Sequence, residues 1–211
     1  MIDLYGIKNI FFDLGGVLIN LDPKRCVNEF QKLGIQAIEE QIGRSFKSGL
    51  FLQLEEGTIT SAGFRNEIRK MTDKHLTDNE IDAAWNSFLR DIPHSKLALL
   101  LELRKHYRVF MLSNTNEIHF DYMKSHDFSA KAGFSIDDYF EKCYLSYELH
   151  LSKPGKAIFE AAINDSGVLA GESLFLDDNR QNIECARELG FRTCFVAENE
   201  DFTGKLSVSD K

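Results

Sequence analysis

The sequence lacks several patterns that would assign a protein to a membrane-spanning, secreted or zinc-binding class. None of its apolar runs approaches the length needed to cross a bilayer. The first residues place Asp3 and Lys8 within an apolar stretch and include no small-residue cleavage site, so we expect no signal peptide. The six histidines show no H-E-x-x-H or other ligand spacing, and internal repeats are absent. These absences predict a globular protein with no membrane partner.

Cysteine is scarce and the charge balance is acidic. The four cysteines, Cys26, Cys143, Cys185 and Cys194, form no C-x-x-C pair, which predicts free thiols in a reducing compartment and therefore a cytoplasmic location. A formal net charge of -8 argues against the nucleic-acid backbone as a partner. An anionic small molecule could still be held by a local cationic site.

What the chain does contain is a regular alternation of apolar segments with helical segments. Its 211 residues are 43% hydrophobic and 27% charged, enough for one α/β core and a smaller unit. The alternation predicts a doubly wound, mostly parallel five-stranded Rossmann-like sheet. Strands are expected at residues 9–13, 108–114, 142–146, 174–178 and 191–196.

Between the first and second expected strands the pattern is helical throughout. Helices are expected at 22–33, 48–56, 61–71 and 77–90, the last opened by a Thr77-Asp-Asn-Glu80 capping box. About seventy residues are too many for a simple crossover between strands, which needs a few dozen. We therefore predict an α-helical cap domain over residues 19–93, inserted into an α/β core domain formed by residues 1–18 and 94–211.

The candidate site residues follow the ends of the predicted strands. Asp13 ends the first strand just before two glycines, Ser113 lies at the end of the second, and the pair Asp177-Asp178 ends the fourth. Lys153 lies in a turn before a helix. Each residue alone has a simple structural explanation, such as a helix cap, a surface cation or a turn. In a parallel sheet, however, these strand ends meet at one edge. Three carboxylates together imply a divalent cation, and oxygen ligands suit Mg²⁺, while a lysine and a hydroxyl could hold a phosphoryl group.

Four segments resemble, in order, the four motifs of the haloacid dehalogenase-like hydrolases. They are Asp13-Leu-Gly-Gly-Val17, Leu112-Ser-Asn114, Ser152-Lys-Pro154 and Phe175-Leu-Asp-Asp-Asn-x-x-Asn182. The helical insert is similar to the cap of the subgroup that carries its cap after the first motif. The first motif and the run from Ser113 to Asn116 are most similar to bacterial sugar-phosphate phosphatases of the glucose-1-phosphate phosphatase type.

The resemblance implies a function and a role for each residue. It implies an Mg²⁺-dependent phosphatase for a small phosphate ester, with a sugar phosphate favoured, in which Asp13 attacks phosphorus and forms an aspartyl-phosphate. Ser113 and the backbone N–H of Asn114 would hold phosphoryl oxygens, and Lys153 would neutralise the charge shared by Asp13 and the phosphate.

The same resemblance implies a magnesium site. It also shows one position at which this sequence differs from most phosphatases of the superfamily. The ion would lie between the Asp13 carboxylate, the backbone carbonyl of Gly15 and Asp178, with Asp177 acting directly or through water. Most phosphatases of the superfamily carry a second aspartate, the general acid, where this chain has Gly15. Losing a positioned acid lowers rates by about 10²- to 10⁴-fold. Asp22 is a candidate substitute, although it also suits the start of a helix.

Three other functions share parts of this pattern. A haloacid dehalogenase also uses an aspartate nucleophile without the second aspartate, but it needs no metal, and the pair Asp177-Asp178 favours a magnesium site. A phosphorelay receiver has its acidic pair first in the chain, and here the pair comes late. A regulatory protein that binds Mg²⁺ and phosphate but has lost turnover stays open as an alternative.

Overall fold

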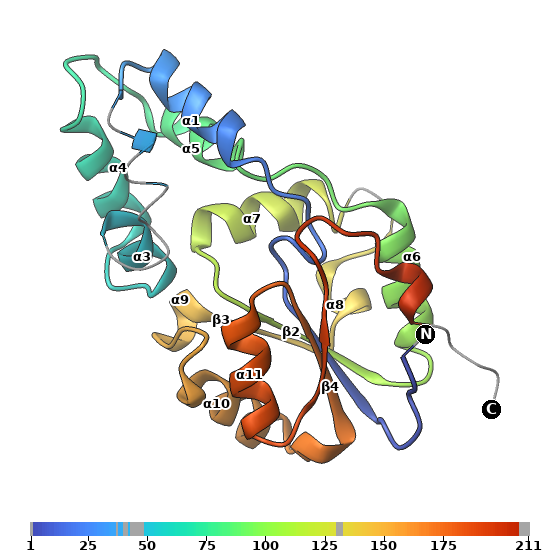
Figure 1. Ribbon diagram of the computed structural model, residues 1–211. Coiled ribbons are helices and arrows are strands. Elements are labelled where there is room, and N and C mark those ends of the chain that lie inside the picture. The colour runs from blue at the N-terminus through green and yellow to red at the C-terminus, as the bar shows by residue number, and fades with distance from the viewer. Residues whose placement is uncertain (1, 37, 40–41, 43–48, 130–132, 207–211) are drawn as a thin grey trace.

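A computed structural model of the protein describes residues 2–36, 38–39, 42, 49–129 and 133–206 (Figure 1). It contains a sheet of five strands, all parallel, in the order β3-β2-β1-β4-β5. The strands are β1 (Asn9–Phe12), β2 (Arg108–Ser113), β3 (Lys142–Leu145), β4 (Ser173–Asp177) and β5 (Arg192–Phe195). The predicted doubly wound α/β core is therefore confirmed.

Helices cover both faces of the sheet. They are α1 (Pro23–Lys32), α3 (Leu50–Glu55), α4 (Ser61–Arg69), α5 (Asp78–Asn86), α6 (His94–Leu103), α7 (Glu117–His126), α8 (Ile136–Tyr139), α9 (Ser146–Leu149), α10 (Lys156–Ser166) and α11 (Arg180–Glu188). The strand β1 shows the alternation between faces: Ile10 and Phe12 belong to the apolar cluster of α6 and α7, whereas Phe11 belongs to that of α10 and α11. Every residue of β1 is buried, so both faces of the central strand are covered by helices.

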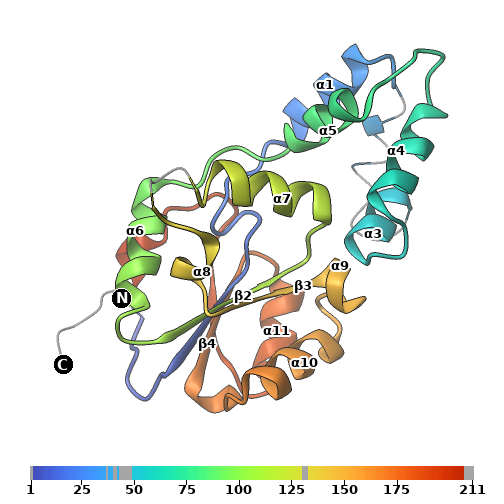
Figure 2. The same ribbon diagram turned by 180° about the vertical axis from the view of Figure 1, so that it is seen from behind.

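The helices α1, α3, α4 and α5 lie together at one end of the molecule, beyond α7 and away from the strands (Figures 1 and 2). Their ends follow the sequence signals. The Asp22 side chain accepts a hydrogen bond from the Arg25 N–H at the start of α1, and Thr77 and Glu80 form the predicted capping box of α5. The expected start of the second helix at residue 48 lies outside the described residues.

Two chain connections join these helices to the remainder, and they pair with one another. The Arg90 N–H donates to the Asn20 carbonyl at 2.8 Å, and the Asp22 N–H donates to the Phe88 carbonyl at 2.8 Å. Leu21 and Leu89 form an antiparallel bridge between these bonds. The chain segments that enter and leave this group of helices therefore run side by side at residues 20–22 and 88–90.

Some elements differ from the prediction. The strand expected at 142–146 ends at Leu145, because the Ser146 hydroxyl donates to the carbonyls of Thr115 and Glu55 and the chain turns into α9. Two short 3₁₀ helices, Ala170–Glu172 and Thr203–Lys205, carry no signal in the sequence pattern. Among the described residues, no helix combines the length and apolar character required to span a membrane.

Candidate active site

The candidate active site lies at the carboxyl edge of the sheet, where three neighbouring strands end. Asp13 follows β1 directly, Ser113 ends β2 and Asp177 ends β4. Because β1 is paired in parallel with both β2 and β4, these residues reach the same edge. Lys153 comes from the loop before α10 and completes the group.

Lys153 is the cation at the centre of the site. Its Nζ lies 2.8 Å from Asp13 Oδ1 and 2.7 Å from Asp177 Oδ2, and its side chain is 1% exposed. Burial works against the charged ammonium, but the two carboxylates outweigh it and raise the pKa of Lys153. A lysine buried in this way stays charged, and it neutralises part of the negative charge that Asp13 and Asp177 bring to the site.

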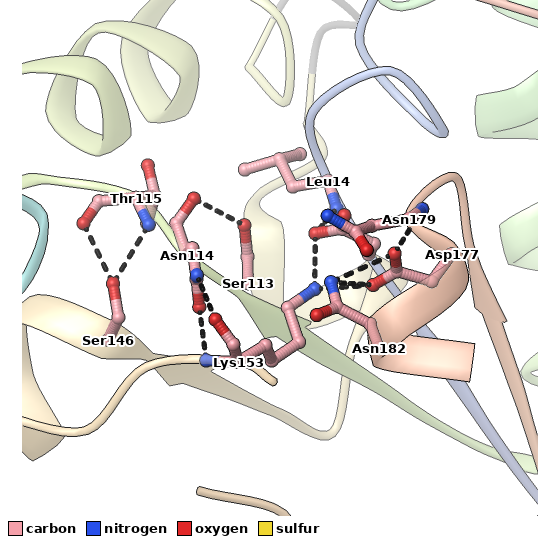
Figure 3. A network of polar contacts seen from close by, with 10 residues as sticks. Leu14, Ser113, Asn114, Thr115, Ser146, Lys153, Asp177, Asn179 and Asn182 are labelled. Carbon is pink, nitrogen blue, oxygen red and sulfur yellow. Dashed lines mark hydrogen bonds and ion pairs between the residues drawn. The ribbon is translucent and has the colours of Figure 1, made fainter. Parts of the chain in front are cut away.

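Asp177 is fixed by several donors besides Lys153 (Figure 3). Its Oδ1 accepts from the backbone N–H of Asn179 at 2.7 Å, and the Asn182 amide donates to both carboxylate oxygens at 3.0 Å. The residue is fully buried. Asp177 therefore holds Lys153 in place from the β4 side, and Asn182 supports that arrangement from the first turn of α11.

Asn114 fixes Lys153 from the other side. Its side-chain amide donates to the Lys153 carbonyl at 2.9 Å, and its side-chain oxygen accepts from the Lys153 N–H at 2.8 Å (Figure 3). The Ser113 hydroxyl next to it is buried and donates to the Asn114 carbonyl at 3.3 Å, a long bond that a better acceptor could replace. The loop that carries Lys153 is thus attached to the end of β2 by a pair of hydrogen bonds.

Three carboxylates at this edge can hold a cation. Asp13, Asp177 and Asp178 each offer an oxygen, and these atoms lie within 4.8 Å of one another. Burial raises the pKa of Asp13 to about 8; Lys153 opposes that rise and the other two aspartates add to it. Burial and the neighbouring Asp177 raise the pKa of Asp178 to about 6. One lysine does not balance this cluster, and a hard divalent cation with oxygen ligands fits the donor set.

The backbone of the loop after β1 leaves room for such a cation site. Gly16 has φ +73°, and a Cβ atom there would lie 2.2 Å from Asp178 Oδ2. Glycine is therefore required at this position, both for the left-handed backbone and for the approach of the Asp178 carboxylate to the loop.

Comparison with known proteins decides the family. The family model for haloacid dehalogenase-like hydrolases matches residues 7–190. The chain belongs to this family. It is 38% identical over 202 residues to a D-ribitol-5-phosphate phosphatase of Bacteroides thetaiotaomicron, a match that covers 96% of this chain and 98% of the relative. The resemblance inferred from the four motifs is thus confirmed.

Solved structures of haloacid dehalogenase-like (HAD) proteins share the whole fold. A HAD family enzyme of Bacteroides thetaiotaomicron, crystallised in complex with magnesium and inorganic phosphate, is 48% identical with a TM-score of 0.90, over 95% of this chain and 100% of that one. A predicted HAD-like hydrolase of Porphyromonas gingivalis is 37% identical with a TM-score of 0.87, over 94% of this chain and 95% of that one.

A cavity of about 350 Å³ opens onto the candidate active site at the sheet edge. Its sheet side is polar and includes Asp13, Ser113, Asn114, Lys153 and Asp178. Its opposite side is mostly apolar and includes Leu21, Pro23, Glu55, Trp85, Phe88 and Leu89 from the helical insert and its connections. The predicted site residues on the sheet side are thus brought together beside a space suited to a small organic molecule.

Gly15 lies in the loop after β1 and lines the cavity. This position agrees with the family resemblance, in which that loop contacts the ligand. The backbone at this position does not need glycine: φ lies outside the left-handed region, and an added Cβ would make an ordinary 3.4 Å contact with Leu21 Cδ1. Asp22, the suggested substitute acid, accepts from the Arg25 N–H at 3.0 Å and caps α1. It is not among the described residues that line the cavity. The helix-cap explanation therefore accounts for Asp22.

Two residues of the cavity, Glu55 and His119, could not be identified from the sequence. Glu55 is the last residue of α3 and lines the cavity together with the sheet-edge residues, although a glutamate next to Glu56 before a glycine looks like an ordinary surface residue. His119 of α7 is buried and stacks on Trp85 of α5 with ring centroids 4.2 Å apart. Only the contacts between the insert and the core, which the sequence pattern does not encode, identify these two residues.

His119 is a neutral histidine that joins the insert to the core. Its Nε2 lies 3.1 Å from the Trp85 carbonyl, so that nitrogen carries the proton and donates it. Burial lowers the pKa of His119 to about 4. The Trp85 Nε1–H in turn donates to Asn116 Oδ1 at 3.3 Å. Two hydrogen bonds and a ring stack thus bind α5 to α7 at the cavity wall.

Proposed function

We propose that the protein is an Mg²⁺-dependent phosphatase that hydrolyses a small phosphorylated sugar or sugar alcohol through an aspartyl-phosphate intermediate. The observation that carries the proposal is the cluster of Asp13, Lys153 and Asp178 at one cavity, with Ser113 beside them. The D-ribitol-5-phosphate phosphatase that is 38% identical over nearly the whole chain supports the same reaction class.

The residues divide the reaction between them. Asp13 attacks phosphorus, the bond to the leaving alcohol breaks, and water then attacks the aspartyl-phosphate, which releases phosphate and restores the carboxylate. Ser113 and the backbone N–H of Asn114 bind phosphoryl oxygens. Lys153 offsets the charge of the approaching phosphate, and its hydrogen bonds to Asn114 and Asp177 keep it oriented without rearrangement.

Asp13, Asp178 and the Gly15 carbonyl would hold Mg²⁺. When bound, the ion would reduce the repulsion between the aspartate nucleophile and the phosphate dianion and polarise the phosphoryl group. Asp177 offers its oxygens to Lys153, Asn179 and Asn182. We therefore assign Asp177 the positioning of Lys153, with contact to the ion only through water.

Residues 19–93 act in this proposal as a cap domain over a core of residues 1–18 and 94–211. Trp85, Phe88 and Leu89 form an apolar surface opposite the phosphate site, which would contact the carbon chain of the substrate. The partner is thus a small phosphate ester and not a nucleic acid, in keeping with the acidic net charge. The irregularly spaced free thiols support a cytoplasmic location.

Phosphate release from a panel of phosphorylated sugars and sugar alcohols, including D-ribitol 5-phosphate, tests the proposal. We expect turnover with Mg²⁺, none after EDTA treatment, and full recovery when Mg²⁺ is added back. Parallel assays with 2-haloacids address the dehalogenase alternative. Halide release without metal would support a dehalogenase, and binding of Mg²⁺ and phosphate without turnover of any ester would support a regulatory protein.

A further inference from the structure

The reaction proposed above requires a proton donor that the usual position does not supply. An alcohol leaves a phosphate ester poorly as an alkoxide, so an acid must protonate the bridging oxygen. Gly15 occupies the place of the acid found in most of the family, and Asp22 is engaged at the start of α1. Resting on the proposed phosphatase function, we infer that Glu55 of the helical insert is the general acid that protonates the leaving alcohol.

Glu55 is placed for this role by the cavity itself. It lines the same cavity as Asp13, Ser113 and Lys153, and it belongs to the helical insert and not to the sheet edge that would hold the phosphate. A leaving alcohol in this cavity would therefore lie between the phosphate and the insert. Its backbone belongs to the last turn of α3, so the carboxyl extends from a helix and not from a loose loop. Within the part of the chain that the structure describes, no hydrogen bond or ion pair occupies that carboxyl.

Three side chains of the core attach the end of α3 at this place. The Ser146 hydroxyl donates to the Glu55 carbonyl at 2.6 Å. His150 Nδ1 lies 3.0 Å from the Glu56 carbonyl, and the Ser152 hydroxyl donates to Glu56 Oε1 at 3.0 Å. Because Ser152 precedes Lys153, the same loop holds the phosphate-binding lysine and the end of α3.

Gly57, which follows Glu56, shows how closely the end of α3 is packed against the core. Gly57 has φ +64°, and a Cβ atom there would lie 2.2 Å from the Tyr147 carbonyl of α9. In both views α3 lies beside α9 (Figures 1 and 2). The backbone that carries the Glu55 carboxyl therefore has a fixed position relative to the core, which limits where that carboxyl can reach.

The electrostatic surroundings suit an acid that works near neutral pH. Burial raises the pKa of Glu55 to about 7; the neighbouring Glu56 adds to the rise, and Lys153 across the cavity opposes it. The carboxyl can therefore carry a proton when the substrate binds and lose it during the reaction.

The proton movements balance over the two half-reactions. As Asp13 Oδ bonds to phosphorus and the bond from phosphorus to the alcohol oxygen breaks, Glu55 gives its proton to that oxygen and becomes a carboxylate. In the second half, Glu55 takes a proton from water as the water oxygen bonds to phosphorus and the bond to Asp13 breaks. Glu55 returns to its acid form, and no other reactant is needed.

Glu55→Gln tests the inference with two substrates. The first is D-ribitol 5-phosphate, whose alcohol needs a proton, and the second is 4-nitrophenyl phosphate, whose phenolate leaves without one. We expect kcat/KM for the first to fall by about 10²- to 10⁴-fold and kcat/KM for the second to change by less than about 10-fold. A slower second half-reaction should also let aspartyl-phosphate accumulate from the aryl substrate. If kcat/KM falls equally for both substrates, or for neither, the inference is wrong.

Two further variants separate this inference from its alternatives. Glu56→Gln is the matched control, because it changes the adjacent glutamate while leaving an oxygen for the Ser152 hydroxyl. It should leave the ratio of the kcat/KM values for the two substrates unchanged.

Adding Gly15→Asp to Glu55→Gln supplies an acid at the usual family position, and it should restore hydrolysis of the sugar-alcohol phosphate. If the wild-type protein hydrolyses neither substrate, the proposed phosphatase function itself fails, which is a different result from equal loss in the variant.

Discussion

The two walls of the cavity are built from opposite kinds of side chain. On the sheet wall, Asp13, Lys153 and Asp177 are each held by more than one partner. Asp177 alone accepts from Lys153, Asn179 and Asn182. On the wall formed by the insert, Trp85 and Phe88 present apolar rings. In the function that we propose, the sheet performs the phosphoryl chemistry, whereas the insert selects the organic part of the substrate. From the described part of the insert, we propose that the Glu55 carboxyl takes part in the chemistry.

The largest expected effect comes from the sheet wall. Asp13→Asn replaces the nucleophile with an amide of the same shape, and we expect phosphatase activity to fall by at least about 10⁴-fold. Steady-state phosphate release measures the loss, and near-ultraviolet circular dichroism checks that the fold is kept. Turnover close to that of the wild type would contradict the assignment of Asp13.

A pair of glycine variants tests how closely the metal site is constrained. Gly16→Ala introduces a Cβ into a left-handed backbone position 2.2 Å from Asp178 Oδ2, so we expect the Mg²⁺ concentration for half-maximal activity to rise by about 10- to 100-fold. Gly167→Ala is the control, since it also places a Cβ at a left-handed position, φ +67°, but with no atom within 4 Å, and it should change that concentration little. Equal effects of the two variants would argue against Asp178 as the metal-binding carboxylate.

A variant of the insert wall tests whether that wall selects the substrate or takes part in the chemistry. Phe88→Ala removes an apolar ring from the cavity, and we expect kcat/KM for sugar phosphates to fall by about 10-fold. Acetyl phosphate, which is too small to reach that wall, should be hydrolysed nearly as before. Leu76→Ala removes a buried side chain of the insert outside the cavity lining and controls for destabilisation. A parallel loss with acetyl phosphate would assign Phe88 a role in the chemistry.

The smallest effect concerns stability at the contact between the walls. The pKa of His119 is lowered to about 4, so below its unfolded value near 6.5 the unfolded chain gains a proton that the folded one does not. Stability contributed by neutral His119 is therefore complete above pH 6.5 and is lost as the pH falls toward 4. Between pH 7.5 and 5 the wild type should lose about 2 kcal/mol from this group.

His119→Phe measures that loss. Phenylalanine keeps a ring against Trp85 but does not titrate, so urea unfolding at the two pH values should show a smaller decrease for the variant by about 2 kcal/mol. Equal decreases for the wild type and the variant would mean that His119 is protonated in the folded protein.

Much of the sheet wall could be predicted from the sequence, because its signals are local. An apolar segment that ends on Asp13, Ser113 or Asp177 indicates a strand and a polar group at its carboxyl end, and parallel pairing then brings those ends together. The capping box at Thr77 and Glu80 likewise lies within one helical turn. The sequence pattern does not indicate that Asp177 is held by Lys153, since that ion pair joins the end of β4 to the separate loop before α10.

The insert wall could not be predicted in the same way, because its features depend on contacts across the chain. In the sequence, the residues around Glu55 look like those around any solvated glutamate. Its place at the cavity becomes evident only in the fold, where the Ser146 hydroxyl donates to the Glu55 carbonyl and α3 packs on α9. The helix α9 itself forms where the Ser146 hydroxyl bonds to Thr115 and Glu55 and so ends β3. Such bonds follow from the packed fold and leave no period or spacing in the sequence.

In the reaction that we propose, the substrate transfers its phosphoryl group to Asp13 at the sheet edge. The most direct measurement is rapid acid quenching of the protein with Mg²⁺ and a sugar phosphate during turnover, followed by mass spectrometry of its peptides. We expect one phosphoryl group on the peptide that carries Asp13, formed and lost at rates consistent with turnover and absent after EDTA treatment. Phosphate release with Asp13 unmodified throughout, or a phosphoryl group on another residue, would contradict it.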